Sequence, residues 1–377
     1  MSKKLLLIML LVVVSCMFLF ACDGGQKDSK TLTIGALLPM TGSEAPYGAD
    51  MMNSYKMAID EVNAAGGVLG YTLDIFSADD ACDPTQANTA GAKIVSANPD
   101  FVVGGYCSGA TIPALQLFLD ADKLMLISAA NSTKITALGL PQTFMVNSPG
   151  GQQIDIFIKL LKELGSKNVS VIHQGDDYTK DLSDLCDRML PAADYNVVTT
   201  DVMQKGEQDI SAIVNKIRAA NADMVLWCGY FADGSNVIKQ LRNGGYTGEI
   251  CCGDGSSAPE LIVGSGQQGD GVYVLSPPYV NFAEGGQEYI DKYKSSYGGS
   301  EPGPYSTLCY DTIMLLVDSI KRANSIETAK VVKAIEENNY TGFSGNLAFA
   351  ADHTHLISNF IVLQINAATG EYEFFLK

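Results

Sequence analysis

The stretch from residue 101 to residue 133, FVVGGYCSGATIPALQLFLDADKLMLISAANST, decides the fold of this 377-residue chain. It opens with the apolar run Phe101 to Val103, which predicts a short strand ending at two glycines. Apolar residues between positions 115 and 119 predict the buried face of a helix, and Leu124 to Ile127 predicts a second strand. Strand, helix and strand make a βαβ unit, whose parallel strands we expect to be buried on both faces.

Small, hydroxyl-bearing segments follow both predicted strands: CSGAT at residues 107–111 and SAANST at residues 128–133. In open α/β sheets, ligands bind beyond the carboxyl ends of the strands. Hydroxyls and free N–H groups at helix starts suit a carboxylate. Two ordinary loops with serine helix caps explain the same residues, so this stretch alone leaves both interpretations open.

The rhythm of strand and helix continues along the chain and predicts an α/β fold with two doubly wound, parallel-sheet lobes. Turn-forming segments mark three crossovers between the lobes, which together make a three-strand hinge. A ligand would bind between the lobes. The predicted boundaries are residues 31–149 plus 277–352 for lobe 1, and residues 150–276 plus 353–377 for lobe 2.

The chain is acidic, with a formal net charge of −17 at pH 7. Removal of the first 21 residues takes away two lysines and no acidic residue, which leaves −19. Nucleic acids require a basic surface, so this charge argues against a nucleic-acid partner.

Residues 1–21 have the pattern of an export signal. Two lysines precede the ten apolar residues Leu5 to Val14, a run shorter than the roughly 20 residues of a membrane-spanning helix. The sequence LFAC at residues 19–22 is similar to a bacterial lipobox, although its second residue is unusually large. We expect a lipoprotein signal peptide, a lipid on Cys22 that anchors the protein to the membrane, and a polar tether over residues 22–30. A signal without lipid and an uncleaved anchor are the alternatives.

Seven ordered segments carry a resemblance to a known family: IGALLPMTG (34–42), YGADM (47–51), AIDEVNAAGG (58–67), DDACDPTQA (79–87), CSGATIPA (107–114), MLISAANST (125–133) and SGNLAF (344–349). They resemble the leucine/isoleucine/valine-binding proteins, the extracytoplasmic receptors of branched-chain amino acid ABC transporters. The resemblance extends over about residues 31–365. It implies the periplasmic binding protein type 1 fold and a monomeric receptor, without a cofactor, that delivers a small L-amino acid to permease subunits.

The resemblance also implies where the charged ends of the ligand bind. Ser108 matches a hydroxyl that holds the ligand carboxylate, and Ser132 stands where the family has a threonine with the same role. The backbone carbonyl of Ala130 would accept from the ammonium group. Tyr230 and Asp254 would reach across from the second lobe. The family usually has a glutamate in place of Asp254, so the ligand would sit deeper or the lobes would close further.

Aromatic residues are expected around the ligand side chain. Tyr47, Tyr178 and Tyr305 match aromatic positions of the family. Tyr106 stands where the leucine binders have an aliphatic residue, which narrows the pocket and adds a hydroxyl that requires a partner. This substitution argues against leucine, isoleucine and valine, and leaves small, polar or aromatic side chains open.

The resemblance pairs Cys82 with Cys107 in a disulfide beside the pocket, as an exported protein permits. Two of the other cysteines after the signal end apolar runs and are expected to be small buried side chains. The spacing does not favour a metal site. These other cysteines are Cys186, Cys228, Cys251, Cys252 and Cys309.

Three other functions use the same residues. A sensor that reports to a receptor would share the pocket, and so would a receptor for urea or a short amide, although Asp254 argues against a neutral ligand. An enzyme would need a base near a nucleophile such as Ser108. The only histidines are His173 at a strand end and His353 and His355, which we expect in a solvated turn. No serine lies in a G-x-S-x-G motif, so we expect no enzyme.

Overall fold

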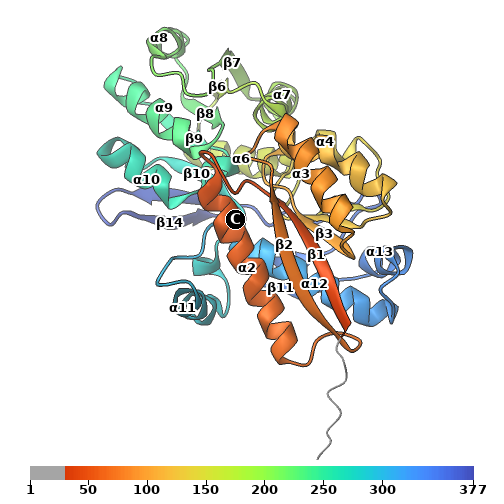
Figure 1. Cartoon of the computed structure of the whole chain (residues 1–377). Helices are drawn as coiled ribbons and strands as arrows, with labels where there is room; N and C mark the ends of the chain where they lie inside the picture. Colours follow the sequence, from red (N-terminus) through yellow and green to blue (C-terminus); the bar gives the residue numbers. More distant parts are fainter. Residues whose placement is uncertain (1–29) are drawn as a thin grey trace, which may run out of the picture.

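The structure is a computed structural model, and it describes residues 30–377. Two β-sheets lie side by side, each with helices on its faces, as the alternation of strands and helices predicted (Figure 1). The predicted signal peptide, the lipid on Cys22 and residues 22–29 of the tether lie outside the described residues. Lys30, the last residue of the predicted tether, begins the first strand.

The first sheet has five parallel strands in the order β2-β1-β3-β4-β5. Its strands are β1 (Lys30–Leu38), β2 (Tyr71–Asp79), β3 (Phe101–Gly104), β4 (Met125–Ile127) and β5 (Thr143–Met145). Successive residues of β3 belong to different packed clusters: Phe101 and Val103 to one, Val102 to the other. The βαβ unit predicted from residues 101–133 is therefore confirmed, with strands buried on both faces.

Helices cover both faces of this sheet. The helices α2 (Ala45–Ala64) and α12 (Ser306–Ala323) pack against each other, and α3 (Pro84–Ala97) packs against α4 (Ser108–Asp120). The short helix α5 (Thr133–Thr136) follows β4. The helices α11 (Gly286–Ser296) and α13 (Thr328–Glu336) return to this part of the molecule.

The second sheet has seven strands in the order β14-β13-β10-β9-β8-β6-β7. They are β6 (Asn168–His173), β7 (Asn196–Val202), β8 (Met224–Cys228), β9 (Glu249–Cys252), β10 (Tyr273–Ser276), β13 (Ile361–Asn366) and β14 (Glu371–Leu376). Five of the strands are parallel, and β13 and β14 add an antiparallel edge, so this sheet is mixed rather than wholly parallel.

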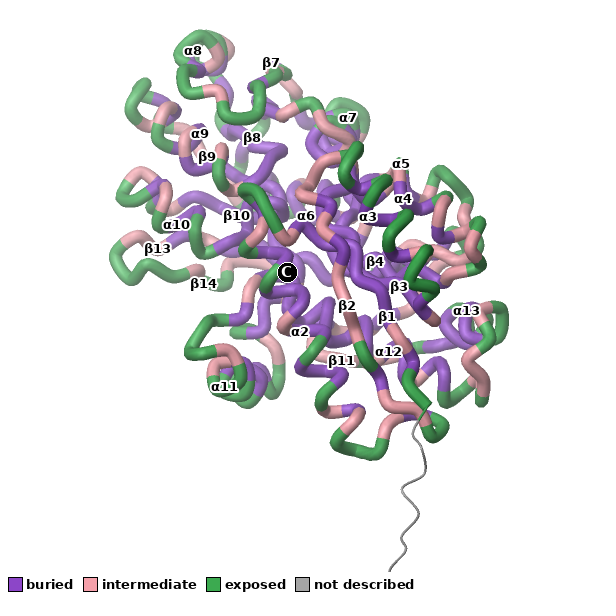
Figure 2. Tube along the Cα trace, viewed as in Figure 1, coloured by how far each residue is buried: buried purple, intermediate pink, exposed green. Residues whose placement is uncertain are grey.

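The second sheet is also covered on both faces. Residues of α6 (Gly150–Leu164) and α7 (Asp177–Ala192) pack on one face. Residues of α8 (Ser211–Ala219), α9 (Phe231–Asn243) and α10 (Pro259–Ser265) pack on the other. The inner strands of both sheets are buried and the outer helices expose one side (Figure 2).

The end of the chain differs from the prediction. The sequence from Leu356 to Ile365 is rich in apolar residues and predicts one long last strand, but β13 begins only at Ile361. Leu356 and Ile357 are exposed on the preceding segment. The pairing of β11 (Tyr340–Gly342) with β12 (Gly345–Leu347) in a hairpin was not predicted, and neither was the edge strand β14.

The chain passes between the sheets before α6, after β10 and before β13. Two of these passages are joined directly, because the Ser148 hydroxyl donates to Asn359 Oδ1 at 2.8 Å and accepts from the Asn359 N–H at 3.2 Å. Within residues 30–377, no helix combines the length and apolar character that crossing a membrane requires.

Candidate ligand-binding site

Asp254 is the centre of the site between the two sheets. It follows β9 at the start of a short 3-10 helix (Asp254–Ser256), and only 1% of its surface is exposed. The apolar run Ile250 to Cys252, followed by Gly253-Asp254-Gly255, predicts either a functional carboxylate or an ordinary turn aspartate just beyond a buried strand, and the structure places Asp254 at that strand end. Five side chains donate hydrogen bonds to its carboxylate: Tyr178 (2.7 Å), Gln153 (2.7 Å), Asn131 (2.9 Å), Asn147 (3.3 Å) and Tyr305 (3.3 Å).

Burial raises the pKa of Asp254 above the ordinary value of an aspartate, and hydrogen bonds from Tyr178 and Gln153 offset part of this shift. None of the ion pairs formed within residues 30–377 includes Asp254. A buried carboxylate that is held by neutral donors alone is suited to a cationic group from a ligand.

Tyrosines surround this carboxylate. The Tyr106 ring lies 5.5 Å from that of Tyr305 and 6.1 Å from that of Tyr230, and Tyr178 lies 5.5 Å from Tyr230. Tyr47 stacks on Tyr106 at 4.6 Å, and its hydroxyl donates to the Gly255 carbonyl at 3.4 Å. Tyr106 therefore meets aromatic residues from both sides of the site.

The space beside Asp254 is small. Its volume is about 10 Å³, on the scale that holds one water molecule. Five of the nine predicted ligand-binding residues line it. The lining residues are Tyr106, Ala129, Asn131, Tyr178, Tyr230, Asp254, Gly255 and Tyr305.

The residues expected to hold the ligand carboxylate lie beside this space rather than on its wall. Ser108 begins α4, and its hydroxyl accepts from the Ser132 N–H at 3.3 Å. The Ser132 hydroxyl caps α5 and donates to Asp181 at 3.1 Å, across to the second sheet. Ala130, whose carbonyl is expected to accept from the ligand ammonium group, is next to the lining residue Ala129. The roles of these three residues stay predictions.

Three amides of the site were missed by the sequence analysis. Asn131 lies in the loop after β4, Asn147 after β5, and Gln153 in the first turn of α6. All three are buried, and all three donate to Asp254. The only signal in the sequence was their proximity to predicted loops and crossovers, because nothing in their spacing shows that they converge.

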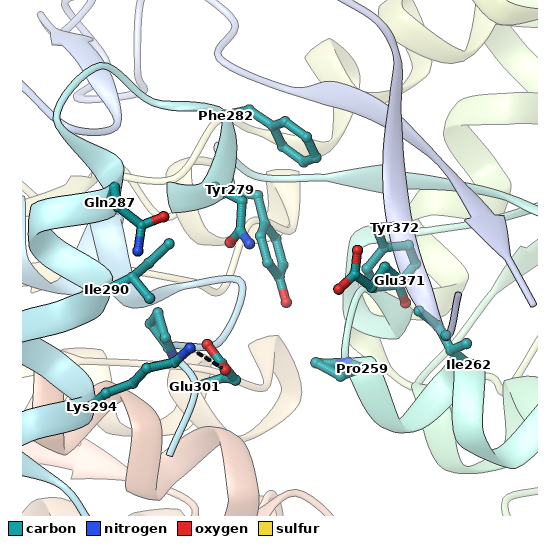
Figure 3. Close-up of a pocket in the computed structure, with 13 residues that line it drawn as sticks. Pro259, Ile262, Tyr279, Phe282, Gln287, Ile290, Lys294, Glu301, Glu371 and Tyr372 are labelled. Atoms are coloured by element: carbon teal, nitrogen blue, oxygen red, sulfur yellow. Dashed lines mark ion pairs between the residues drawn. The ribbon is translucent and has the colours of Figure 1, made fainter. Parts of the chain in front are cut away.

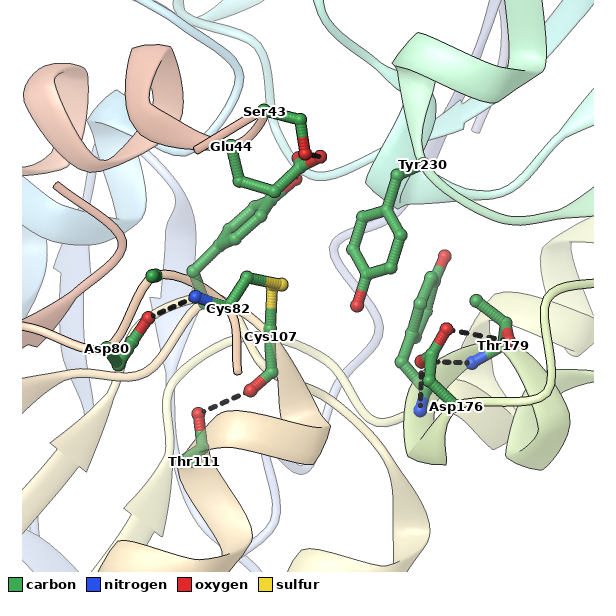
Figure 4. The surroundings of a disulfide bond; sticks show 12 residues. Ser43, Glu44, Asp80, Cys82, Cys107, Thr111, Asp176, Thr179 and Tyr230 are labelled. Atoms are coloured by element: carbon green, nitrogen blue, oxygen red, sulfur yellow. Dashed lines mark hydrogen bonds between the residues drawn. A yellow bond between two sulfur atoms is a disulfide. The ribbon is translucent and has the colours of Figure 1, made fainter. Parts of the chain in front are cut away.

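The predicted disulfide between Cys82 and Cys107 is present, with a Cα–Cα distance of 5.4 Å. Gly104 and Gly105 lie just before Cys107 in the chain. A Cβ on Gly104 would lie 2.3 Å from the Leu37 carbonyl oxygen, so only glycine fits there. Figure 4 shows Glu44 and the disulfide on one side of the site and Tyr230 on the other.

The remaining five cysteines after residue 30 are buried and free, as expected for two of them from their apolar runs. Within the described part of the chain, no three histidine, cysteine or acidic side chains are grouped to hold a metal ion.

The expectation of solvated histidines near the end of the chain is wrong, because His353 and His355 are buried. His353 stacks on Phe144 at 4.0 Å and lies 3.1 Å from Glu336. His355 lies 2.7 Å from the Asn346 carbonyl oxygen, and burial lowers its pKa. The His353 ring is therefore buried against β5, and the His355 ring is buried beside β12 and Ser148 of the first crossover.

Two larger cavities do not reach Asp254, although Tyr47 lines one of them. One of about 380 Å³ has Tyr279 and Phe282 on one side and Tyr372 on the other (Figure 3). Another of about 440 Å³ shares Glu301 and Pro302 with it. Neither includes Asp254 among its lining residues.

Comparison with known proteins gives the family. A family model for periplasmic binding proteins matches residues 31–371. An amino acid binding protein from Pseudomonas aeruginosa is 28% identical over 340 residues, which cover 88% of this chain and 90% of that protein. A leucine-, isoleucine-, valine-, threonine- and alanine-binding protein from the same organism is 26% identical over 321 residues, 85% of this chain and 86% of that protein.

Solved structures share the fold. A leucine-binding protein from Thermotoga maritima has a TM-score of 0.83 at 24% identity, over 91% of this chain and 97% of that one. A branched-chain amino acid transporter substrate-binding protein from Streptococcus pneumoniae, in complex with isoleucine, has a TM-score of 0.80 at 23% identity, over 91% and 98%. With a periplasmic binding protein type 1 fold and a family match over residues 31–371, this chain belongs to the periplasmic binding protein family.

Proposed function

We propose that this protein is an extracytoplasmic receptor that binds a small L-amino acid between its two lobes, delivers it to the permease of an ABC transporter and catalyses no reaction on it. The observation that supports this most is the buried Asp254 carboxylate, which faces a tyrosine-lined space and has neutral partners only within the described chain. An α-ammonium group is the cation that fits such a carboxylate.

Similarity supports the same ligand class. The two Pseudomonas aeruginosa relatives are named for amino acid binding and cover most of this chain. In this proposal the ligand carboxylate binds at Ser108 and Ser132, the ammonium group at Asp254 and the Ala130 carbonyl, and the side chain among the tyrosines. Donors to Asp254 come from both sheets, so a ligand held there favours the closed arrangement of the lobes.

The receptor would act as a monomer, held to the cell membrane through a lipid on Cys22 or free in the periplasm. Lobe 1 would comprise residues 31–149 plus 277–352 and lobe 2 residues 150–276 plus 353–377, and the three passages between them would serve as the hinge.

Isothermal titration calorimetry tests this proposal. The protein beginning at Asp23 is unfolded and refolded to remove any solute bound during expression, and is then titrated with the twenty L-amino acids. We expect micromolar or tighter binding of one or a few of them, and loss of binding in Asp254→Ala. If no amino acid binds to a correctly refolded protein, the proposed function is wrong.

A further inference from the structure

Tyr106 forms the wall of the site on the side of the first sheet. It is buried, and its hydroxyl donates to Glu44 Oε2 at 3.2 Å. Its ring is stacked on Tyr47 with an angle of 24° between the planes, and it meets Tyr305 edge-on at 83°. Contacts on three sides therefore hold this side chain in one orientation.

Glu44 is a second buried carboxylate at the site. It directly precedes α2 without a side-chain capping hydrogen bond, and only 1% of its surface is exposed. Its two oxygens accept from the Ser43 hydroxyl (3.0 Å) and from Tyr106. It forms no ion pair within residues 30–377. Burying a carboxylate without a cation lowers the stability of the fold. A position that keeps this cost is more consistent with a role in ligand recognition, through the hydrogen bond to Tyr106, than with a role in stability.

We infer that Tyr106 excludes large ligand side chains and that Glu44 is the residue that positions it, so the receptor selects glycine, alanine or serine over leucine, isoleucine and valine. This inference rests on the proposed function and narrows its ligand class. The space beside Asp254 is about 10 Å³, which is smaller than any amino acid, so every ligand must displace the walls. Each additional methyl group then adds strain against the packed tyrosines. The amino acids with the smallest side chains require the least displacement of Tyr106.

Titration of the refolded full-length mature protein with glycine, L-alanine, L-serine and L-leucine tests the selectivity. We expect L-leucine to bind about tenfold or more weakly than the tightest of the small amino acids. In Tyr106→Leu we expect L-leucine to bind more tightly than the small amino acids, because the leucine side chain is smaller than tyrosine and has no hydroxyl, which leaves a larger and more apolar space. Tighter binding of L-leucine by the unchanged protein would overturn the inference and leave the proposed function standing. No binding of any amino acid would overturn both.

The role of Glu44 is tested by its effect on the leucine-to-alanine ratio of dissociation constants. Glu44→Gln keeps an acceptor for the Tyr106 hydroxyl, and Glu44→Ala removes it. Because Glu44→Ala removes the charged acceptor of this hydrogen bond, we expect the ratio to fall about tenfold, equivalent to about 1.4 kcal/mol, and to change less than about twofold in Glu44→Gln.

Glu61 offers a matched control, because it accepts from the Tyr310 hydroxyl at 2.6 Å outside the site. Glu61→Ala should leave the ratio unchanged. If Glu44→Ala does not fold, Tyr106→Phe breaks the same hydrogen bond and is expected to lower the ratio in the same direction. A ratio that stays constant in whichever of these two variants folds would show that Glu44 does not position the wall.

Discussion

The side-chain amide of Asn131 donates to the carboxylate of Asp254 at 2.9 Å, and this bond joins the loop after a strand of the first sheet to the loop after a strand of the second. Gln153 approaches the same carboxylate from α6, on the second sheet. One buried charge is therefore held from both sides. A change at Asp254 is expected to affect ligand recognition and the closing of the lobes together.

Asp254→Asn should abolish amino acid binding. The change removes the negative charge that faces the ligand ammonium group and places an amide N–H₂ group among five donors. Loss of one partner of a buried charge pair costs roughly 2–5 kcal/mol, so we expect at least a 30-fold rise in the dissociation constant by calorimetry. Circular dichroism controls for folding. Unchanged affinity would remove Asp254 from the ligand site.

Binding should weaken in mild acid. Burial raises the pKa of Asp254, and the ammonium group requires the carboxylate in its charged form. As the pH falls through this raised pKa, the carboxylate is protonated and affinity declines, beginning at a higher pH than for an ordinary aspartate. Titrations between pH 8 and pH 4 measure this effect. A constant affinity over that range contradicts the assignment.

Gln153→Leu should reduce affinity about tenfold and move the loss of binding to higher pH. Gln153 donates to Asp254 at 2.7 Å and stabilises its charged form. Gln152→Leu is the control, because the neighbouring side chain donates to the His355 carbonyl instead. Equal effects of the two changes would show that α6 acts through general packing.

Asp181→Ala should accelerate ligand release. Its carboxylate accepts from the Thr133 N–H (2.7 Å), the Thr133 hydroxyl (2.6 Å) and the Ser132 hydroxyl, and so joins α7 to the first sheet. Its loss leaves these donors unpaired and favours opening, which we expect to raise the dissociation rate about tenfold in stopped-flow fluorescence. Asp184→Ala, on the same helix but paired only with exposed Lys180, should release ligand at the normal rate.

Replacing Cys82 and Cys107 together by serine should destabilise the protein. The bond closes a loop with a sequence separation of 25 residues, which on the chain-entropy account stabilises by about 3–4 kcal/mol. Urea unfolding of the variant and of the unchanged protein measures the difference. The same replacement at Cys309, which is buried and free, tests whether any loss arises from polarity alone.

The fold was predictable because short apolar runs ended by glycines recur at regular intervals, and the parallel sheet buries such runs on both faces. The strand β14 was missed because its residues are only partly buried at a sheet edge, so they lack a clear pattern. The run from Leu356 was assigned to a strand because its apolar residues do not reveal that a crossover leaves them exposed.

The site could be predicted at positions where the residue type is unusual for its place in the chain. Asp254 stood out as a carboxylate between glycines beyond a buried strand, and Tyr106 stood out against the family's aliphatic residue. Asn131 and Gln153 did not, because amides are common in loops and helix starts and only the folded chain shows which of them meet. Burial of His353 and His355 likewise depends on contacts with distant segments such as Phe144.

The disulfide fastens the loop that carries the pocket wall, because Cys107 directly follows Tyr106 in the chain. Such a bond forms in an oxidising compartment and not in the reducing cytoplasm. In an exported receptor, a newly synthesised molecule therefore lacks this fastening until secretion is complete. We therefore expect the loop that carries Tyr106 to reach its final rigidity only after export.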